Sequence, residues 1–92
     1  MDREAFERLR DDLDSIIAPV KFRLAEEVYS HASFGSMYAV WSRRGESIRL
    51  VWDGKEAMLV LQTRTDTDWS DLAYGPSSEA EVILAAARQH VS

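Results

Sequence analysis

The sequence predicts an α+β fold in which two helices lie on one face of a four-stranded antiparallel sheet. Three observations predict it: an amphipathic segment at each end of the chain, runs of alternating apolar residues between them, and short turn sequences that separate those runs. The order helix, four strands, helix favours both helices on the same sheet face. A length of 92 residues allows one hydrophobic core, so residues 1–92 are expected to form a single domain.

The first helix is expected from Asp2 to about Ala18. Its apolar residues recur every three or four positions and so form one stripe along a helix: Phe6, Leu9, Leu13, Ile16 and Ile17. Asp2 can cap the helix, because its carboxylate can accept hydrogen bonds from the free amides of the first turn. Pro19 ends it, since proline disfavours the α conformation of the preceding residue.

Four strands are expected in the middle of the chain. The first opens with apolar residues that alternate with Lys21 and Arg23, which is typical of a strand with one buried face. Arg44-Gly45 and Asp53-Gly54 read as turns, and the second of these is preferred in two-residue hairpin loops. The expected strands are Val20–His31, Ser36–Arg43, Ser47–Trp52 and Glu56–Thr63, joined as a meander.

The turns also predict which side chains share a face of the sheet. Successive side chains of a strand point to opposite faces, and a two-residue Asp53-Gly54 loop sets Trp52 opposite Lys55. Trp52 and Leu50 are therefore expected to be deeply buried beneath the helices. The complete helix-covered set is Met37, Ala39, Trp41, Ile48, Leu50, Trp52, Ala57, Leu59 and Leu61.

The other face is expected to carry an exposed apolar patch. Two helices of about 10 Å diameter can cover one face of a four-stranded sheet but not both. Patches of this kind mark partner or ligand surfaces. The alternatives are that one helix crosses to this face, or that strand propensity alone selected valine and tyrosine there. The predicted interface residues are Tyr38, Val40, Arg49, Val51, Met58 and Val60.

A polar loop and a closing helix are expected after Arg64. The loop runs to Pro76, and its apolar residues Trp69, Leu72 and Tyr74 are interpreted as anchors to the body of the domain. Ser78 and Glu81 have the spacing of a capping box, in which each side chain bonds to a free backbone amide of the first helical turn. The final helix follows.

No residue pattern indicates a catalytic, metal or cofactor site, and the protein is expected not to be an enzyme. The chain has no cysteine, and its two histidines, His31 and His90, lack a metal-ligand spacing. Asp66 and Asp68 resemble the start of a calcium loop, but Asp71 stands where the turn glycine belongs. Nucleotide-binding and hydrolase fingerprints are absent.

Net charge and hydropathy restrict the kinds of partner and the location that we expect for the protein. Eleven basic against sixteen acidic residues give a net charge of −5, which disfavours nucleic acid. Arg43, Arg44, Arg49 and Arg64 form the main basic cluster and are interpreted as the rim of a protein interface, where arginine is enriched. The charged N-terminal segment lacks the apolar run of a signal peptide or membrane span, so no membrane partner and a cytoplasmic location are expected.

The leading hypothesis is a non-enzymatic protein-interaction module that forms a homodimer through the second sheet face. One alternative is a small-ligand binder or minor enzyme with a pocket between helices and sheet, lined by Trp41, Trp52 and Trp69. Another, based on charge and size alone, is an acidic inhibitor, immunity or chaperone-like partner protein.

Overall fold

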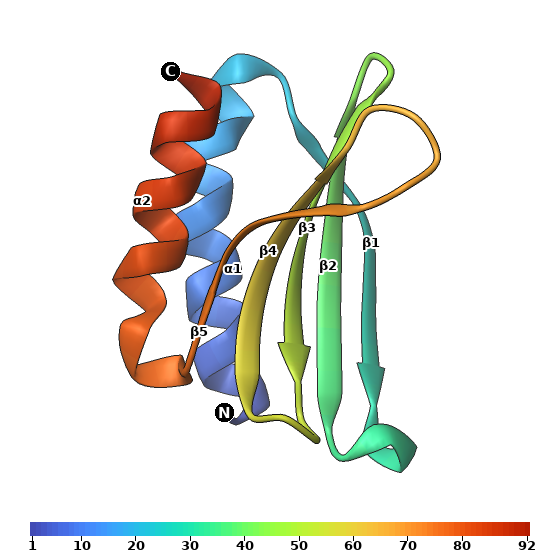
Figure 1. Ribbon diagram of the computed structural model, residues 1–92, viewed down its shortest axis with the longest axis vertical. Coiled ribbons are helices and arrows are strands. Elements are labelled where there is room, and N and C mark those ends of the chain that lie inside the picture. Colours follow the sequence, from blue (N-terminus) through green and yellow to red (C-terminus); the bar gives the residue numbers. More distant parts are fainter.

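Two helices form one layer and a five-stranded antiparallel sheet forms the other in the computed structural model, which describes all residues from Met1 to Ser92 (Figure 1). The strands lie in the sheet in chain order, each antiparallel to the next. The predicted α+β class and the placement of both helices on one face are confirmed, but the predicted number of strands is wrong. The helices and strands are α1 (Arg3–Ile17), β1 (Arg23–Ser30), β2 (Ser36–Arg43), β3 (Glu46–Asp53), β4 (Met58–Arg64), β5 (Ser70–Gly75) and α2 (Ala80–Val91).

Helix α1 forms much as its sequence predicts. The Asp2 carboxylate accepts a hydrogen bond of 2.7 Å from the Ala5 amide and caps the first turn. The helix ends at Ile17, one residue before the expected end, and Pro19 lies in a short 3-10 turn, η1 (Ala18–Val20). Neither α1 nor α2 is long and apolar enough to cross a membrane.

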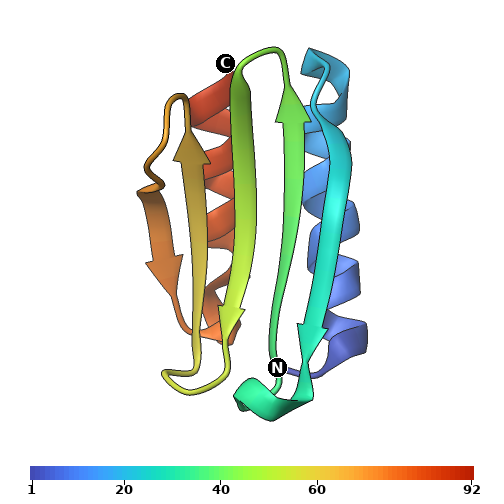
Figure 2. The ribbon, with the colours of Figure 1, turned by 90° about the vertical axis from the view of Figure 1, so that its right-hand side faces the viewer.

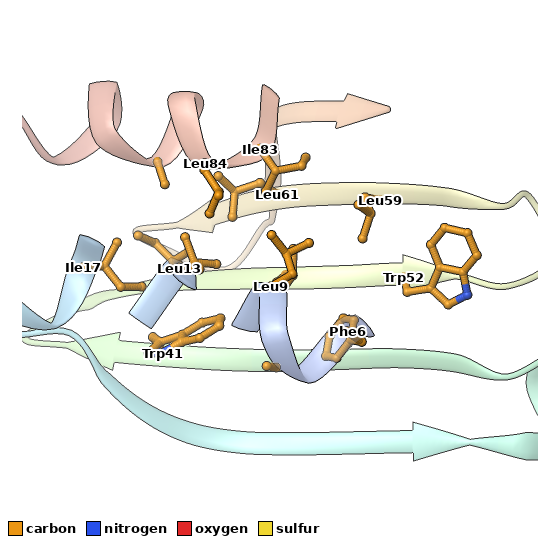
Figure 3. Close-up of a cluster of buried hydrophobic side chains, with 14 of the residues drawn as sticks. Phe6, Leu9, Leu13, Ile17, Trp41, Trp52, Leu59, Leu61, Ile83 and Leu84 are labelled. Carbon is orange, nitrogen blue, oxygen red and sulfur yellow. The ribbon is translucent and has the colours of Figure 1, made fainter. Parts of the chain in front are cut away.

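The core lies between the helices and the sheet (Figure 3). Leu50 is fully buried and Trp52 is 6% exposed, as the alternation along β3 predicts. The buried indole of Trp41 donates a 2.9 Å hydrogen bond from Nε1 to Oδ1 of Asp14, which ties β2 to α1. Buried residues of both helices complete the core: Phe6, Leu9, Leu13, Ile17, Ile83, Leu84 and Ala87.

The β3–β4 turn differs from its prediction. The strands pair Trp52 with Leu59 and Asp53 with Met58, so the loop contains four residues and not two. A two-residue loop would have aimed the charged Lys55 into the core beside Trp52, and burying an unpaired charge is costly. The longer loop preserves the face assignment of β4, but Ala57 lies exposed in the loop with φ +54° and not in the core.

Strand β1 begins later than predicted and is less buried. Val20 lies in η1, and the strand starts at Arg23, after the buried Phe22. A shift in pairing at residue 25 interrupts the alternation, and Leu24 is 43% exposed at the sheet edge. Beyond the shift, Glu27 faces α1, where its Oε2 lies 2.7 Å from Nη1 of Arg10.

Residues 70–75 form a fifth strand in place of the predicted loop. Strand β5 pairs with β4 through Tyr74 and Val60, with a shift in pairing beside Asp71. A 3-10 turn, η3 (Ser77–Glu79), then leads into α2. The predicted capping box does not form, because Ser78 lies inside η3 and no side chain caps α2.

Candidate interaction surface

No helix covers the sheet face turned away from α1 and α2, which is called the open face here, and the loop between β4 and β5 brings Trp69 onto it (Figure 2). Strand pairing brings one apolar residue from each of the five strands into a continuous line across this face. These residues, called the apolar row, are Val28, Tyr38, Val51, Val60 and Tyr74. Cross-strand neighbours of this kind lie about 4.5–5.5 Å apart, so the row forms one uninterrupted apolar strip.

The apolar row is only partly shielded from water. Four of its members are half-buried by their cross-strand neighbours, and Tyr74 on the edge strand is 65% exposed. Val40 and Met58 flank the row on the same face, so the open face collects all six residues of the predicted interface. That these six residues form an interface stays a prediction.

Two members of the row were missing from that prediction. Val28 follows the pairing shift in β1, which hides the alternation, and Tyr74 belongs to a strand that was expected to be a loop. The signal for Val28 was the alternation of Glu27, Val28 and Tyr29, in which the middle residue must face away from its neighbours.

A second line of residues, called the polar row, runs beside the apolar row. It consists of Glu26, Val40, Arg49, Gln62 and Asp71. Arg49 donates from Nε to Oε1 of Gln62 at 2.8 Å, and Gln62 donates from Nε2 to Oδ1 of Asp71 at 2.9 Å. These two hydrogen bonds hold the Arg49 guanidinium on the surface of the sheet.

Two arginines stack on one tryptophan at this face. The guanidinium carbons of Arg49 and Arg64 lie 4.1 and 4.5 Å from the ring centre of Trp69, within cation–π range. Burial lowers the pKa of Arg49, and the positive charge of Arg64 lowers it further. Arg10 and Arg43 are ion-paired with Glu27 and Glu46, whereas Arg49 and Arg64 form no ion pair.

Arg49 and Arg64 differ from the other basic residues without an ion pair because they are half-buried, whereas those others are exposed. A half-buried arginine loses part of its hydration and is stabilised by a carboxylate in contact with it. Such a carboxylate is present for Arg10 and Arg43 but not for the two arginines on Trp69. Asp71 and Glu26 lie near enough to raise the pKa of Arg49, but neither forms an ion pair with it, so a direct ion pair with Arg49 would have to come from a partner.

The pKa of Tyr38, the member of the apolar row on β2, is affected by a charged residue of the open face. Burial raises the pKa of the Tyr38 phenol, and the neighbouring Glu26 carboxylate raises it further. Tyr38 therefore stays protonated at neutral pH and can act as a hydrogen-bond donor. Tyrosine combines apolar area with a polar tip, which suits a surface that is wet in one state and covered in another.

The three tryptophans proposed to line a ligand pocket do not lie together. Trp41 and Trp52 belong to the core, whereas Trp69 lies on the open face against the guanidinium groups of Arg49 and Arg64. The largest surface hollow, of about 540 Å³, has no hydrophobic lining residue and lies at the β2–β3 hairpin, where Ser42, Ser47 and Arg64 contribute to its wall.

Neither histidine belongs to the apolar row or the polar row. His31 is exposed in a 3-10 turn between β1 and β2. His90 lies in the last turn of α2, with Nε2 3.4 Å from Oε2 of Glu46. No group of three or more histidine or acidic side chains is arranged to hold a metal ion. Comparisons with family models, with curated proteins and with solved structures find no match, so the surface is interpreted from its own geometry.

Proposed function

We propose that this chain is a non-enzymatic protein-interaction module that self-associates through the open face. The observation that carries the proposal is the apolar row, which crosses all five strands on a sheet face that neither helix covers. In a face-to-face dimer, the row of each protomer would be buried against the partner as a second core between two sheets.

The size of the open face supports a dimer of modest stability. Five strands spaced about 4.8 Å apart and overlapping over about seven residues cover an area of about 24 by 23 Å. Contact over that area would bury about 1,100 Å² from the two protomers together, just above the ~1,000 Å² expected of a specific interface. We therefore expect a dimer that dissociates on dilution in the micromolar range.

The chemistry of the face also suits a partner that is a protein. Its central strip is apolar, its margin is polar, and arginine, tyrosine and methionine are residues that protein interfaces favour. The stacked arginines already cover Trp69, the tryptophan that could otherwise stack on a nucleic-acid base. The net charge of −5 adds to the case against a nucleic acid.

Val51→Glu tests the proposal. Val51 is the central member of the apolar row, and a carboxylate there would meet its own copy in the dimer without touching the core. Sedimentation equilibrium over a micromolar to millimolar range should show wild type rising from 10.5 kDa toward twice that mass, while Val51→Glu stays at the monomer mass.

The matched control is Val82→Glu, which adds the same charge at a 46% exposed valine of α2, on the other side of the molecule. It should dimerise like wild type. Circular dichroism should show that both variants remain folded. A wild type that stays monomeric, or a dimer that survives Val51→Glu, would contradict the proposal.

A further inference from the structure

Charge on the open face is distributed unevenly along its two central strands. Arg49 and Arg64 lie between the apolar row and the β2–β3 hairpin end of β3 and β4. Two acidic residues and one basic residue lie at the other end, where Asp53 closes β3 and Lys55 and Glu56 are exposed in the turn. Oδ1 of Asp53 accepts from the Lys55 and Glu56 amides, and no hydrogen bond within the chain uses its Oδ2. Because Arg49, Val51 and Asp53 alternate along β3, the cation and the carboxylate are equally far from the apolar row.

We infer that the two-fold axis of the dimer runs along the apolar row, across the strands, and places Arg49 of each protomer opposite Asp53 of the partner subunit. The inference rests on the proposed function, because it specifies how the same face meets a second copy. It also gives Arg49 a carboxylate in direct contact, whereas Asp71 and Glu26 of its own chain act on it without an ion pair.

Two arrangements of the two sheets in a dimer need to be compared, both with nearly aligned strands. Aligned sheets keep their strand directions within about 30° of each other. The two-fold axis between them runs either along β3 or across the strands. An axis along β3 exchanges β1 with β5 and preserves the position along each strand. An axis along the apolar row lays each strand over its own copy and reverses the position along it.

The axis along β3 brings like charges together. Arg49 lies on the central strand, so it would meet Arg49 of the partner subunit. Glu26 on β1 would meet Asp71 of the partner subunit, because both belong to the polar row at equal distances from β3. Like-charge contacts in a desolvated interface are strongly unfavourable. This arrangement also adds positive charge beside a guanidinium that burial already disfavours.

The axis along the apolar row brings opposite charges together. Arg49 meets Asp53 of the partner subunit, and Arg64 approaches Glu56 of the partner subunit near the turn. The apolar row then lies directly over its own copy, with the valines and tyrosines of each strand in contact. Arginine and carboxylate can pair through two parallel hydrogen bonds, which fixes the register of the two sheets.

A single spin label distinguishes the two axes. The chain has no cysteine, so a cysteine introduced at the exposed hairpin residue Arg44 carries the label at one position. Arg44 lies seven residues from Val51, which at about 3.3 Å per residue places the two labels about 45 Å apart for the inferred axis. An axis along β3 would leave both labels at the same end of the dimer, within about 20 Å.

Pulsed electron paramagnetic resonance on Arg44→Cys should therefore give a distance near 45 Å. A distance below about 20 Å, or one near 35 Å from sheets crossed at right angles, would overturn the inferred axis while leaving the dimer in place. A sample that sediments as a monomer and gives no distance would instead overturn the proposed function. Arg44→Cys combined with Val51→Glu is the control and should give no distance.

A charge-exchange experiment tests the contact itself. Arg49→Glu and Asp53→Lys should each weaken self-association at least about tenfold, because each homodimer then contains two like-charge contacts. Asp53→Lys also removes the acceptor of the Lys55 and Glu56 amides, so circular dichroism checks that it folds, and Asp53→Asn, which retains an acceptor, is its control and should weaken self-association less. An equimolar mixture should form a heterodimer with an affinity within about threefold of wild type, since both contacts are again between opposite charges. Preferential pairing of Arg49→Glu with wild type, and not with Asp53→Lys, would overturn the inference.

Discussion

The two faces of the sheet are built from alternating residues of the same strands, yet they differ in how completely they are covered. Leu50 faces the helices and is fully buried, whereas its neighbour Val51 faces outward and is only half-buried. Helices α1 and α2 complete the core on one side, whereas no helix covers the other side, where Trp69 packs against Arg49 and Arg64. Apolar alternation along a strand therefore does not by itself show which face of the sheet is covered within the monomer.

The polar groups differ between the faces in the same way. On the helix side, Trp41 is paired with Asp14 and Arg10 is paired with Glu27. On the open face, Arg49 and Arg64 are stacked on Trp69 without a carboxylate partner. The cations and the indole named here are therefore paired on the helix side and unpaired with carboxylates on the open face, although Nε2 of His90 in α2 is itself buried without a hydrogen-bond partner.

The largest expected difference is between truncations of neighbouring residues on β3. Leu50→Ala should destabilise the fold by about 2–5 kcal/mol, because it leaves a cavity in the closed core. Val51→Ala should cost about 1 kcal/mol or less in the monomer, since the side chain is already partly exposed and water can fill the space. Urea unfolding at low protein concentration measures both, and equal costs would show that the open face is covered within the monomer.

Loss of a hydrogen bond should also cost more free energy of unfolding on the helix side than on the open face, by a smaller difference than for the truncations on β3. Asp14→Ala leaves the buried Trp41 N–H without an acceptor and should cost about 1–3 kcal/mol. Asp14→Asn retains an acceptor and should cost less. Gln62→Ala on the open face lets water replace the lost partner of Arg49, so we expect a change of less than about 1 kcal/mol. A larger effect at Gln62 than at Asp14 would reverse the comparison.

Association should make stability depend on protein concentration. A dimer that forms only from folded chains stabilises them by mass action. The urea midpoint of wild type should therefore rise between micromolar and millimolar protein, while the midpoint of Val51→Glu stays constant. A constant wild-type midpoint over that range would show that the open face contributes nothing to stability in solution.

The smallest expected effect is a change of stability in alkaline solution. Burial raises the pKa of Tyr29, and its hydrogen bond to Glu27 raises it further. A raised folded-state pKa means that this stabilisation is complete below about pH 10, the unfolded value, and is lost as the pH rises through the folded value. Tyr29→Phe should reduce the loss of unfolding free energy above pH 10, and an unchanged pH dependence would contradict this assignment.

The sequence predicted the faces of β2 and β3 because their two-residue turn and strict alternation leave one consistent pattern. Leu50 and Trp52 are buried as expected. The β3–β4 turn was predicted wrongly because Asp53-Gly54 was weighed as a local turn signal. The structure instead uses the Asp53 carboxylate to accept from the Lys55 and Glu56 amides, and so supports a longer loop that excludes Lys55 from the core.

Strand β5 could not be predicted from the pattern of residues in its own segment. Its residues include serine, aspartate, alanine and glycine, which have low strand propensity, and only pairing with β4 holds them extended. Because β5 was missed, Tyr74 was left out of the candidate surface. The stacking of two arginines on Trp69 was missed for a related reason, since residues 49, 64 and 69 meet only through the sheet.

If the proposal is right, the open face is covered in solution by a second copy. Hydroxyl-radical footprinting of the unmodified protein at rising concentration tests this most directly. We predict that Tyr74 and Met58 on the open face become protected as dimer forms, while Met1 and Val82 on the helix side keep their reactivity. Reactivity of Tyr74 and Met58 that does not change with concentration, or protection confined to the helix side, would contradict the account.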